Sequence, residues 1–357
     1  MQQIQNNPAQ SLATLKEFSR RDYLEAPETY LEALEAVSGI LTQEGGLVQL
    51  PDVPTIILPD LHARRELLIE VLSTHIEEGS VAGGQIFELL QQGRINVVCV
   101  GDIPHSEMRS DWVINLDGEW TQELLDREMV RSLGTALMVM YLKLQYPAHF
   151  FCLRGNHDDM AGELARDFRK YVGLKYNEND QLVLNDEGKP VLTSDKGESI
   201  LVREWVLNRK GWGYKFLYKW SRFERALPLM AQGSYFVVSH TLPHQAVKKT
   251  DIQDMYRPRI VSLELTLRRG VKQEAIEGTL ENLGVREQVK RWFHGHTPVP
   301  QEKYGGKYDE GLDGLTIRLN NPKKYVFAYV PASTDERLFD PEKDVYIKAE
   351  DEGRFYR

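Results

Sequence analysis

Six polar side chains of the kinds that bind divalent metal ions lie at or just after the ends of short apolar runs. The runs read TIILPDLH, INVVCVGD, HFFCLRGNH, SYFVVSH and RWFHGH. Such runs predict buried β-strands, and strands that end at one sheet edge deliver the residues after them to a common surface. We therefore expect these residues to converge in the folded chain. They are Asp60, His62, Asp102, Asn156, His240 and His296.

The chemical types in this set indicate phosphoryl chemistry. Two carboxylates, three imidazoles and one amide form a mixed oxygen and nitrogen set that suits two divalent cations. Asp60 and His62 are one residue apart, and in extended backbone such positions point to the same side, so both can hold one ion. The carboxylate of Asp102 has two oxygens and can bridge two ions. A pair of cations about 3.5–4 Å apart is a common catalytic device for phosphoryl groups.

The elements that must position these residues follow from the hydrophobic periodicity. Strand patterns alternate with helical ones, which predicts a layered α/β core. Helical spacing over residues 10–45, closed by two glycines, predicts an N-terminal helical extension, and further helices are predicted at 64–78 and 121–145. Near the end of the chain, residues 315–320 and 324–331 are predicted to form the two strands of a hairpin.

Residues 160–218 form a polar, irregular insertion. It contains a predicted hairpin, with apolar triplets at 182–184 and 190–192 around a Gly turn. Because it follows the Asn156 loop directly, it could roof the predicted metal site, or it could be a surface excursion with a small core of its own. We divide the chain into a helical extension (1–50), a catalytic domain (51–335, including this insertion) and an acidic C-terminal tail (336–357).

The composition excludes several classes of protein. A hydrophobic content of 41% and a charged content of 27% are typical of globular proteins. The net charge of −9, without clustered Lys and Arg, argues against a nucleic-acid partner. Because the chain shows neither a secretion signal nor a membrane-spanning apolar segment, we expect a cytoplasmic protein without a membrane partner. Cys99 and Cys152 are expected to be small buried side chains rather than a disulfide or catalytic thiols.

Three stretches resemble the calcineurin-like metallophosphoesterases, and within them the serine/threonine phosphoprotein phosphatases with their bacterial and phage relatives. The stretches are LKLQYPAHFFCLRGNHDDM (142–160), FERALPLMAQGSYFVVSHTLP (223–243) and FHGHTPVP (293–300). The resemblance covers about residues 54–335. It implies an α/β fold with a two-sheet sandwich flanked by helices. It also implies two divalent metal ions, which could be manganese, iron, zinc or magnesium, with manganese favoured.

The resemblance implies a role for each predicted ligand. Asp60 and His62 would bind the first ion, and Asp102 would bridge the pair. The second ion would be bound by Asn156, His240 and His296. A hydroxide between the two ions would attack phosphorus directly, without a covalent intermediate. His157 would donate a proton to the leaving oxygen, a task that suits an imidazolium.

The segment after Asp102 departs from the family pattern. Protein phosphatases usually read G-D-x-x-D-R-G, whereas this chain reads G-D-I-P-H-S-E at 101–107. The missing Asp normally orients the proton-donating histidine, and the missing Arg holds substrate phosphate. Asp158, Asp159 or His105 could support His157 instead. The candidates for the missing guanidinium are Arg64, Arg109, Arg257 and Arg259.

We predict that the chain hydrolyses phosphate monoesters of a phosphoprotein or of a small metabolite. The phosphodiesterase branches of the family commonly read G-H-x-H at the last motif, and this chain has Pro298 in place of the second histidine. Two alternatives remain open. One is hydrolysis of dinucleoside polyphosphates. The other, suggested by the altered 105–107 segment, is a metal-binding protein of weak activity that acts through interactions.

Overall fold

The computed structural model describes residues 8–19, 27–106, 121–160, 205–254 and 256–350, and isolated positions between 173 and 193. Arg109 and most of the predicted insertion lie outside these residues. The described part of the insertion includes β5 (Gly173–Leu174), which pairs antiparallel with β6 (Leu192–Thr193). Most of the predicted 182–192 hairpin lies outside the described residues.

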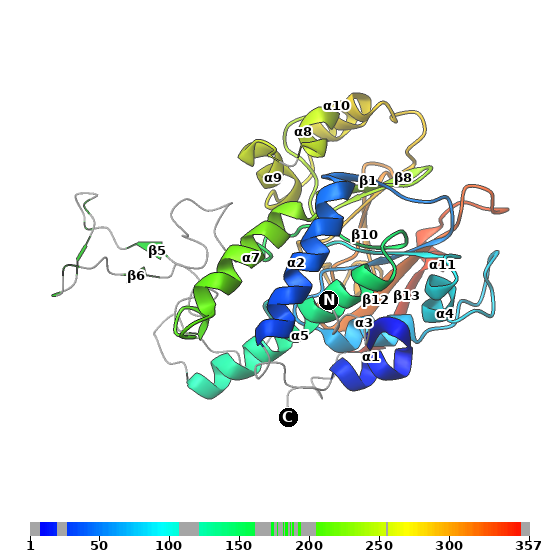
Figure 1. The fold of residues 1–357 in the computed structure, drawn as a ribbon. Coiled ribbons are helices and arrows are strands. Elements are labelled where there is room, and N and C mark those ends of the chain that lie inside the picture. Colours follow the sequence, from blue (N-terminus) through cyan, green and yellow to red (C-terminus); the bar gives the residue numbers. More distant parts are fainter. Residues whose placement is uncertain are drawn as a thin grey trace.

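Two β-sheets form the centre of the molecule (Figure 1). The first sheet has six strands in the spatial order β1 (Leu47–Gln49), β7 (Met230–Gln232), β8 (Phe236–Ser239), β9 (Arg291–His294), β11 (Thr316–Arg318) and β10 (Asp309–Gly311). The second has five strands in the order β13 (Val345–Glu350), β12 (Lys324–Val330), β2 (Thr55–Leu58), β3 (Asn96–Cys99) and β4 (Phe150–Cys152). Neighbours β2, β3 and β4 run parallel, as do β8 and β9, so their carboxyl ends lie together within each sheet.

The strands bury both of their faces, which explains their nearly continuous apolar sequences. Along β2, Ile57 points into a cluster shared by the two sheets, together with Val238 and Phe293 of the first sheet. Ile56 and Leu58 point to the opposite face and join a second cluster beneath the helices. This alternation follows from the two-residue period of a strand. The predicted two-sheet α/β sandwich is confirmed.

Helices cover the outer faces of both sheets (Figure 1). Those over the second sheet are α1 (Leu12–Ser19), α2 (Pro27–Glu44), α3 (Arg65–Leu72), α4 (Ile86–Gln91), α5 (Gln122–Gln145) and α7 (Gly213–Ala226). Those over the first sheet are α8 (Lys249–Gln253), α9 (Arg259–Thr266) and α10 (Gln273–Leu283). Among the described residues, no helix is long and apolar enough to cross a membrane.

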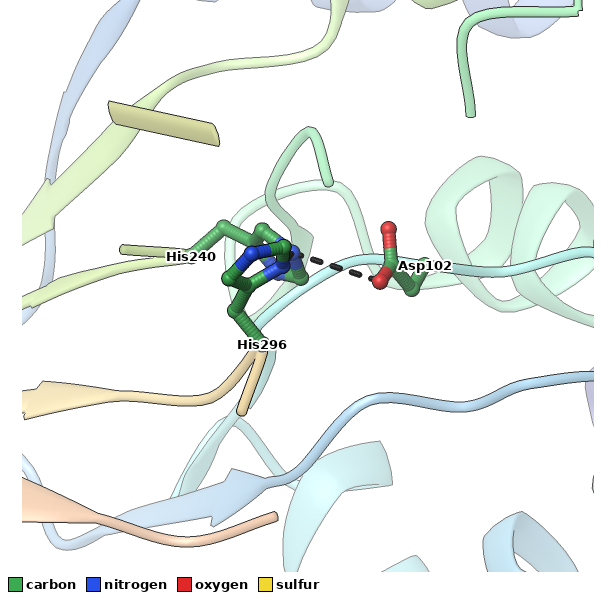
Figure 2. Close-up of side chains that lie close together, drawn as sticks. All are labelled: Asp102, His240 and His296. Atoms are coloured by element: carbon green, nitrogen blue, oxygen red, sulfur yellow. Dashed lines mark hydrogen bonds and ion pairs between the residues drawn. The ribbon is translucent and has the colours of Figure 1, made fainter. Parts of the chain in front are cut away.

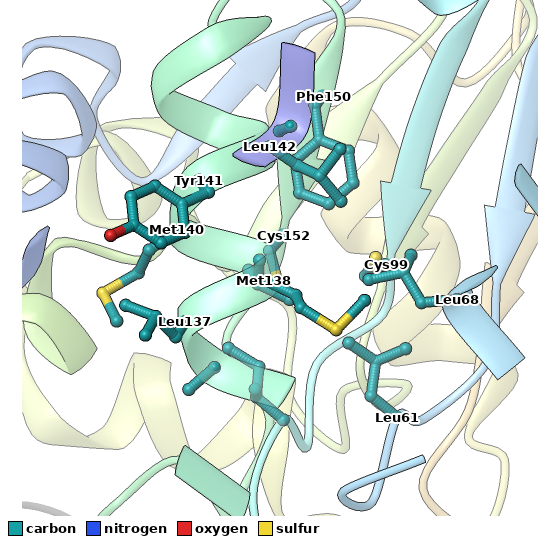
Figure 3. Packing of buried hydrophobic residues seen from close by; sticks show 14 of the residues in the cluster. Leu61, Leu68, Cys99, Leu137, Met138, Met140, Tyr141, Leu142, Phe150 and Cys152 are labelled. Carbon is teal, nitrogen blue, oxygen red and sulfur yellow. The ribbon is translucent and has the colours of Figure 1, made fainter. Parts of the chain in front are cut away.

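The predicted helices at 10–45 and 121–145 are present, and α3 ends earlier than predicted, at Leu72. Pro27 at the first position of α2 and Gly45 with φ of 77° after its end are favourable helix boundaries. Met138 of α5 belongs to the same buried cluster as Cys99 of β3 and Cys152 of β4 (Figure 3). Both cysteines are buried and free, as predicted.

The predicted hairpin at 315–331 is wrong. β11 pairs with β9 and β10 in the first sheet, whereas β12 pairs with β2 and β13 in the second. The short link at 319–323 therefore crosses from one sheet to the other. Two adjacent apolar runs indicate two strands, but their local pattern does not reveal whether they pair with each other, because pairing depends on residues far away in the sequence.

The chain end differs from the expected acidic tail. Residues 341–350 form α11 (Pro341–Asp344) and β13, which pairs antiparallel with β12 at the edge of the second sheet. Val345 and Ile347 lie opposite Ala328 and Val326 in this pairing. The many charges of the segment hid this alternation, since an edge strand keeps one side exposed to water.

Candidate metal centre

The six predicted ligands gather where the carboxyl ends of β2, β3 and β4 meet those of β8 and β9. The Asp102 Oδ2 atom lies 3.7 Å from His62 Nε2 and 3.3 Å from His240 Nε2. His240 Nε2 also lies 3.1 Å from the Asn156 side-chain oxygen and 3.3 Å from His296 Nδ1. Figure 2 shows Asp102, His240 and His296 facing one another. All six ligands are buried, with at most 8% of any of them exposed.

Asp102 belongs to two groups of potential ligand atoms at once. One group combines it with Asp60 and His62, and the other with His240 and His296, and within each group the atoms lie within 4.8 Å of one another. A carboxylate common to two such groups can bridge two cations, since each of its oxygens can serve one of them.

The tautomers of two histidines follow from their backbone partners. His62 Nδ1 lies 2.9 Å from the carbonyl oxygen of His105, and His240 Nδ1 lies 3.0 Å from that of Val100. A carbonyl can only accept, so each Nδ1 must carry the proton that it donates. In the neutral rings, the lone pairs therefore lie on Nε2, the atom that faces Asp102 in both cases.

The donor chemistry fits bound cations. Around His240 Nε2, the oxygens of Asp102 and Asn156 present lone pairs at 3.3 and 3.1 Å, and the Nδ1 atom of His296 lies 3.3 Å away. Three acceptors that face one another in a buried space repel unless a proton or a cation lies between them. A divalent cation with oxygen and imidazole ligands satisfies all of them.

Neighbouring groups orient the two carboxylates. The Oδ2 atom of Asp60 accepts hydrogen bonds from the His296 backbone amide at 2.8 Å and from the Asn320 side-chain amide at 2.5 Å. The Oδ1 atom of Asp102 accepts one from the His157 backbone amide at 2.7 Å. Asn320, buried and next to β11, was missed in the sequence. The only sequence signal was a polar residue directly after a strand, and it did not indicate this site.

Two glycines in the motifs are required because these carboxylates lie against the backbone. A Cβ atom at Gly155 would lie 2.1 Å from Asp102 Oδ1, and one at Gly295 would lie 2.0 Å from Asp60 Oδ1. The chain also turns sharply where it presents the ligands: His62, Asp102 and His296 have φ values of 42°, 49° and 67°. Such backbone conformations are rare outside glycine and concentrate at functional sites.

Asp158 links the loops after β3 and β4. Its carboxylate accepts hydrogen bonds from the backbone amides of Asp102, Ile103 and Gly155 at 2.6–3.1 Å. Burial and the charge of Asp102 raise the pKa of Asp158 to about 6. Both of its oxygens are therefore engaged with backbone amides, which gives this residue a role in shaping the loops.

The other predicted supports of His157 occupy different positions. Asp159 forms a fully buried ion pair with Arg154, at 3.5 Å. The ring of His105 stacks on that of His157, with centroids 5.2 Å apart and planes at 23°. The His157 ring also approaches His62, at a centroid distance of 5.2 Å. His157 thus lies directly beside the predicted ligands.

Helix α5 holds the segment that departs from the family pattern. The buried carboxylate of Glu128 accepts hydrogen bonds from the Ser106 amide (2.9 Å), the Ser106 hydroxyl (2.7 Å) and the Ser132 hydroxyl (2.8 Å). The Ser132 oxygen accepts in turn from the His105 amide at 2.9 Å. Burial raises the pKa of Glu128. Through this network, Glu128 fixes the His105 carbonyl that orients His62. Sequence reasoning missed it.

Four arginines were candidates to replace the missing guanidinium, and they are not gathered at the metal centre. Arg64 is buried and donates to the carbonyls of Asp60 and Asn321 at 2.6 and 2.8 Å. Arg257 donates to two carbonyls at the end of α7, Arg259 is exposed at the start of α9, and Arg109 lies outside the described residues.

A different arginine contacts the ligand cluster. The Nε atom of Arg269 lies 3.4 Å from His296 Nε2 and donates to it. The arginine pair at 268–269 before Gly270 was the available sequence signal, but a pair of charges after a helix usually indicates only solvent exposure.

Burial and the charged groups of the metal centre strongly shift the pKa values of its residues. Burial raises the pKa of Asp60 to about 7, and repulsion from Asp102 adds to this shift. Burial opposes the charge on Asp102, but His240, His157 and His62 outweigh it and hold the pKa of Asp102 well below its usual value. Burial opposes the charge on His240 as well, yet Asp102 and Asp60 raise its pKa to about 9. Burial and the neighbouring His240 lower the pKa of His296 to about 3.

Comparisons with known proteins agree with this geometry. Residues 53–300 match the model of a family described as calcineurin-like phosphoesterase. No curated protein matches the chain. Among solved structures, a serine/threonine phosphatase from Saccharomyces cerevisiae, described as similar to human phosphatase PP5, has a TM-score of 0.51 at 14% identity, covering 90% of this chain and 88% of that one. At this identity the likeness concerns the fold alone.

Two other solved structures are more distant. A cold-active protein-tyrosine phosphatase of a psychrophilic Shewanella species has a TM-score of 0.42 at 12% identity, covering 85% of this chain and 82% of that one. A putative diadenosine tetraphosphatase has a TM-score of 0.33 at 15% identity, covering 82% and 96%.

Proposed function

Because this chain belongs to the calcineurin-like phosphoesterase family, and is therefore a hydrolase of phosphate esters, we propose that it is a two-metal phosphomonoesterase. The observation that carries the proposal is the position of Asp102, whose carboxylate is common to two groups of potential ligand atoms. Asp60, His62 and Asp102 would hold one cation. The other would be held by Asp102, Asn156, His240 and His296.

When bound, the two cations would activate a water molecule for attack on phosphorus and neutralise charge on the phosphoryl oxygens. The chain supplies the orientation of the ligands. The carbonyls of His105 and Val100 fix the tautomers of His62 and His240, and Asn320 turns Asp60 toward the cluster. Such supporting contacts set both ligand direction and metal affinity.

His157 is our candidate for the proton donor to the leaving oxygen. Its backbone amide is bound to Asp102 Oδ1 at 2.7 Å, and its ring is held between those of His62 and His105. An imidazole beside the phosphoryl group can transfer a proton to a departing alkoxide. Arg269 is our candidate for contacting a phosphoryl oxygen, because its guanidinium lies against His296 and a planar fork of donors matches phosphate.

The proposed substrate class is based on the last of the sequence motifs, which contains His296. Thr297 and Pro298 follow His296, so this motif offers no further imidazole to the cluster, in agreement with a monoester specificity. The yeast structure with the same fold is described as a serine/threonine phosphatase, and this makes phosphoserine and phosphothreonine peptides the first substrates to try.

Hydrolysis of an aryl phosphate with added Mn²⁺ tests the proposal. We expect Asp102→Asn to lower kcat/KM by more than about 100-fold, the upper end of the loss for outer partners of a metal site. Elemental analysis of protein purified without chelator should find two metal ions per chain, and fewer in the variant. Asp313→Asn makes the same change at an exposed position and should have no effect. Equal rates for wild type and Asp102→Asn would refute the proposal.

A substrate pair separates this function from cleavage of dinucleoside polyphosphates. A phosphomonoesterase should release phosphate from a phosphoserine peptide and leave a dinucleoside tetraphosphate intact. Symmetric cleavage of the dinucleotide without phosphopeptide turnover would support the alternative instead.

A further inference from the structure

A cavity of about 530 Å³ opens between α2, α7 and the segment that joins α8 to α9. Helix α7 contributes Tyr218, Arg222 and Arg225 to its wall, and the joining segment contributes Tyr256 and Arg257. None of the six predicted metal ligands lines it. Its volume is in the range of cavities that hold small organic ligands.

The charge of this cavity is opposite to that of the whole chain. Three arginines and no acidic residue are among the described residues that line it, although the chain carries a net charge of −9. The nearby carboxylate of Glu35, on α2, forms its ion pair with Lys219 of α7. The side chain of Arg222 is exposed to solvent, and its charge also interacts with that of Glu35.

Arg257 forms a fixed part of the wall. It is only 6% exposed, and its Nη2 atom donates to the carbonyls of Arg225 and Leu227 at 3.0 and 3.1 Å. Its Nε atom donates to the Ser262 hydroxyl at 3.3 Å. A guanidinium held in one orientation keeps a positive charge at one place, so a ligand loses little entropy in arranging it.

Two aromatic rings and three hydroxyls complete the lining. Tyr218 is 67% exposed and Tyr256 is 86% exposed, so both rings are open to a ligand. Exposed tyrosines beside arginines are typical of surfaces on which flat heterocycles stack. The hydroxyls of Thr42 and Ser221 offer hydrogen bonds suited to a sugar, whereas that of Ser38 donates to the Leu34 carbonyl at 2.6 Å.

From this combination we propose that the cavity binds a mononucleotide at a site separate from the metal centre. Arg222 and Arg225 would contact the phosphate, because guanidinium groups form paired hydrogen bonds with phosphate oxygens. The rings of Tyr218 and Tyr256 would contact the base. The inference does not depend on the proposed phosphatase activity, since it uses none of the residues of the metal centre.

Calorimetric titration with AMP, adenosine and inorganic phosphate tests this site. The titrations are made in the full chain and in Asp102→Asn, which removes the metal centre as a second place for phosphate. We expect AMP to bind more tightly than either fragment in both proteins. Arg222→Ala and Tyr256→Ala should each weaken AMP binding about tenfold or more, as expected for the loss of a charge-assisted or stacking contact.

Matched controls lie on the same helix. Lys215→Ala removes a positive charge, and Tyr214→Ala an exposed ring, from positions of α7 that do not line the cavity, and both should leave AMP binding unchanged. Hydrolysis of an aryl phosphate should be unaffected in Arg222→Ala. Unchanged AMP affinity in Arg222→Ala and Tyr256→Ala would overturn the proposal. It would also be overturned if adenosine or phosphate alone bound as tightly as AMP.

Discussion

The two sheets contribute to the metal centre in different ways. In the second sheet, the loops that carry ligands are joined by backbone hydrogen bonds, from His62 to Asp102 at 2.6 Å and from Ala63 to Ile103 at 2.9 Å. Asp158, on the loop after β4, adds two bonds to the loop after β3 and one within its own loop. The ligand loops of the first sheet are held to the second mainly by His240 Nδ1 on the Val100 carbonyl and by the His296 amide on Asp60.

This difference suggests that the two sheets hold their metal ligands to different degrees. We expect the loops of the second sheet to keep their shape before any cation binds, because backbone amides and carbonyls make most of the bonds between them. The ligands of the first sheet depend on one carbonyl and on one carboxylate, and Asp60 is itself a ligand. The following experiments test this difference between the two sheets, beginning with the largest expected effect.

Replacing His157 tests a catalytic group that is held by the fixed loops of the second sheet. His157→Asn should lower kcat for an alkyl phosphate by about 10²–10⁴-fold, the usual contribution of a general acid. An aryl phosphate, whose leaving group needs little protonation, should be affected much less, and metal content should be unchanged. His75→Asn, at an exposed histidine, is the control. Equal losses on both substrates would exclude proton donation.

Replacing Glu128 tests the support of the second-sheet loops from α5. Glu128→Ala removes the acceptor for three hydrogen bonds, so the His105 carbonyl should no longer orient His62. We expect metal affinity and activity to fall by about 10–100-fold, the range for outer partners of a metal site. Glu123→Gln, at a carboxylate of α5 that is 81% exposed, should behave as wild type. A variant that loses only thermal stability would show that the network does not reach His62.

Replacing Asn320 tests the link between the sheets. Asn320→Ala leaves Asp60 Oδ2 with the single donor from the His296 amide, so metal affinity should fall by about tenfold, the lower end of the same range. Asn282→Ala removes a comparable bond, to the Val247 carbonyl, far from the centre. It should cost similar stability without any change in metal affinity. If both variants bind metal equally well, Asn320 does not position Asp60.

In the absence of metal ions, His240, which follows β8 of the first sheet, should be the protonated group of the centre. With its pKa raised to about 9, His240 is protonated below that pH, whereas the lowered pKa of Asp102 leaves that carboxylate ionised. A cation takes the lone pair of His240 Nε2, so binding at pH 8 should release about one proton from this residue, and metal affinity should decrease as the pH falls. Titrations in buffers of different ionisation enthalpy measure this number. Absence of proton release would contradict this assignment.

The contacts of the centre explain why some residues could be predicted and others could not. Asp60, Asp102 and His240 lie one to three residues after the ends of buried strands, and this local pattern is visible in the sequence. Glu128 is one of many charged residues on α5, and Asn320 follows a strand without a recognisable motif. Their importance arises from partners in distant segments, such as Ser106 and Asp60.

The sequence by itself determined the strands, the long helices and the identity of the residues that could bind metal, because hydrophobic periodicity and side-chain chemistry are local properties. Only the tertiary structure decided that β11 and β12 belong to different sheets, that the acidic chain end adds β13 to the second sheet, and that Arg269 lies against His296. Strand pairing and contacts between loops depend on residues far apart in the chain. No local pattern specifies them, since the same apolar run can pair with any compatible edge.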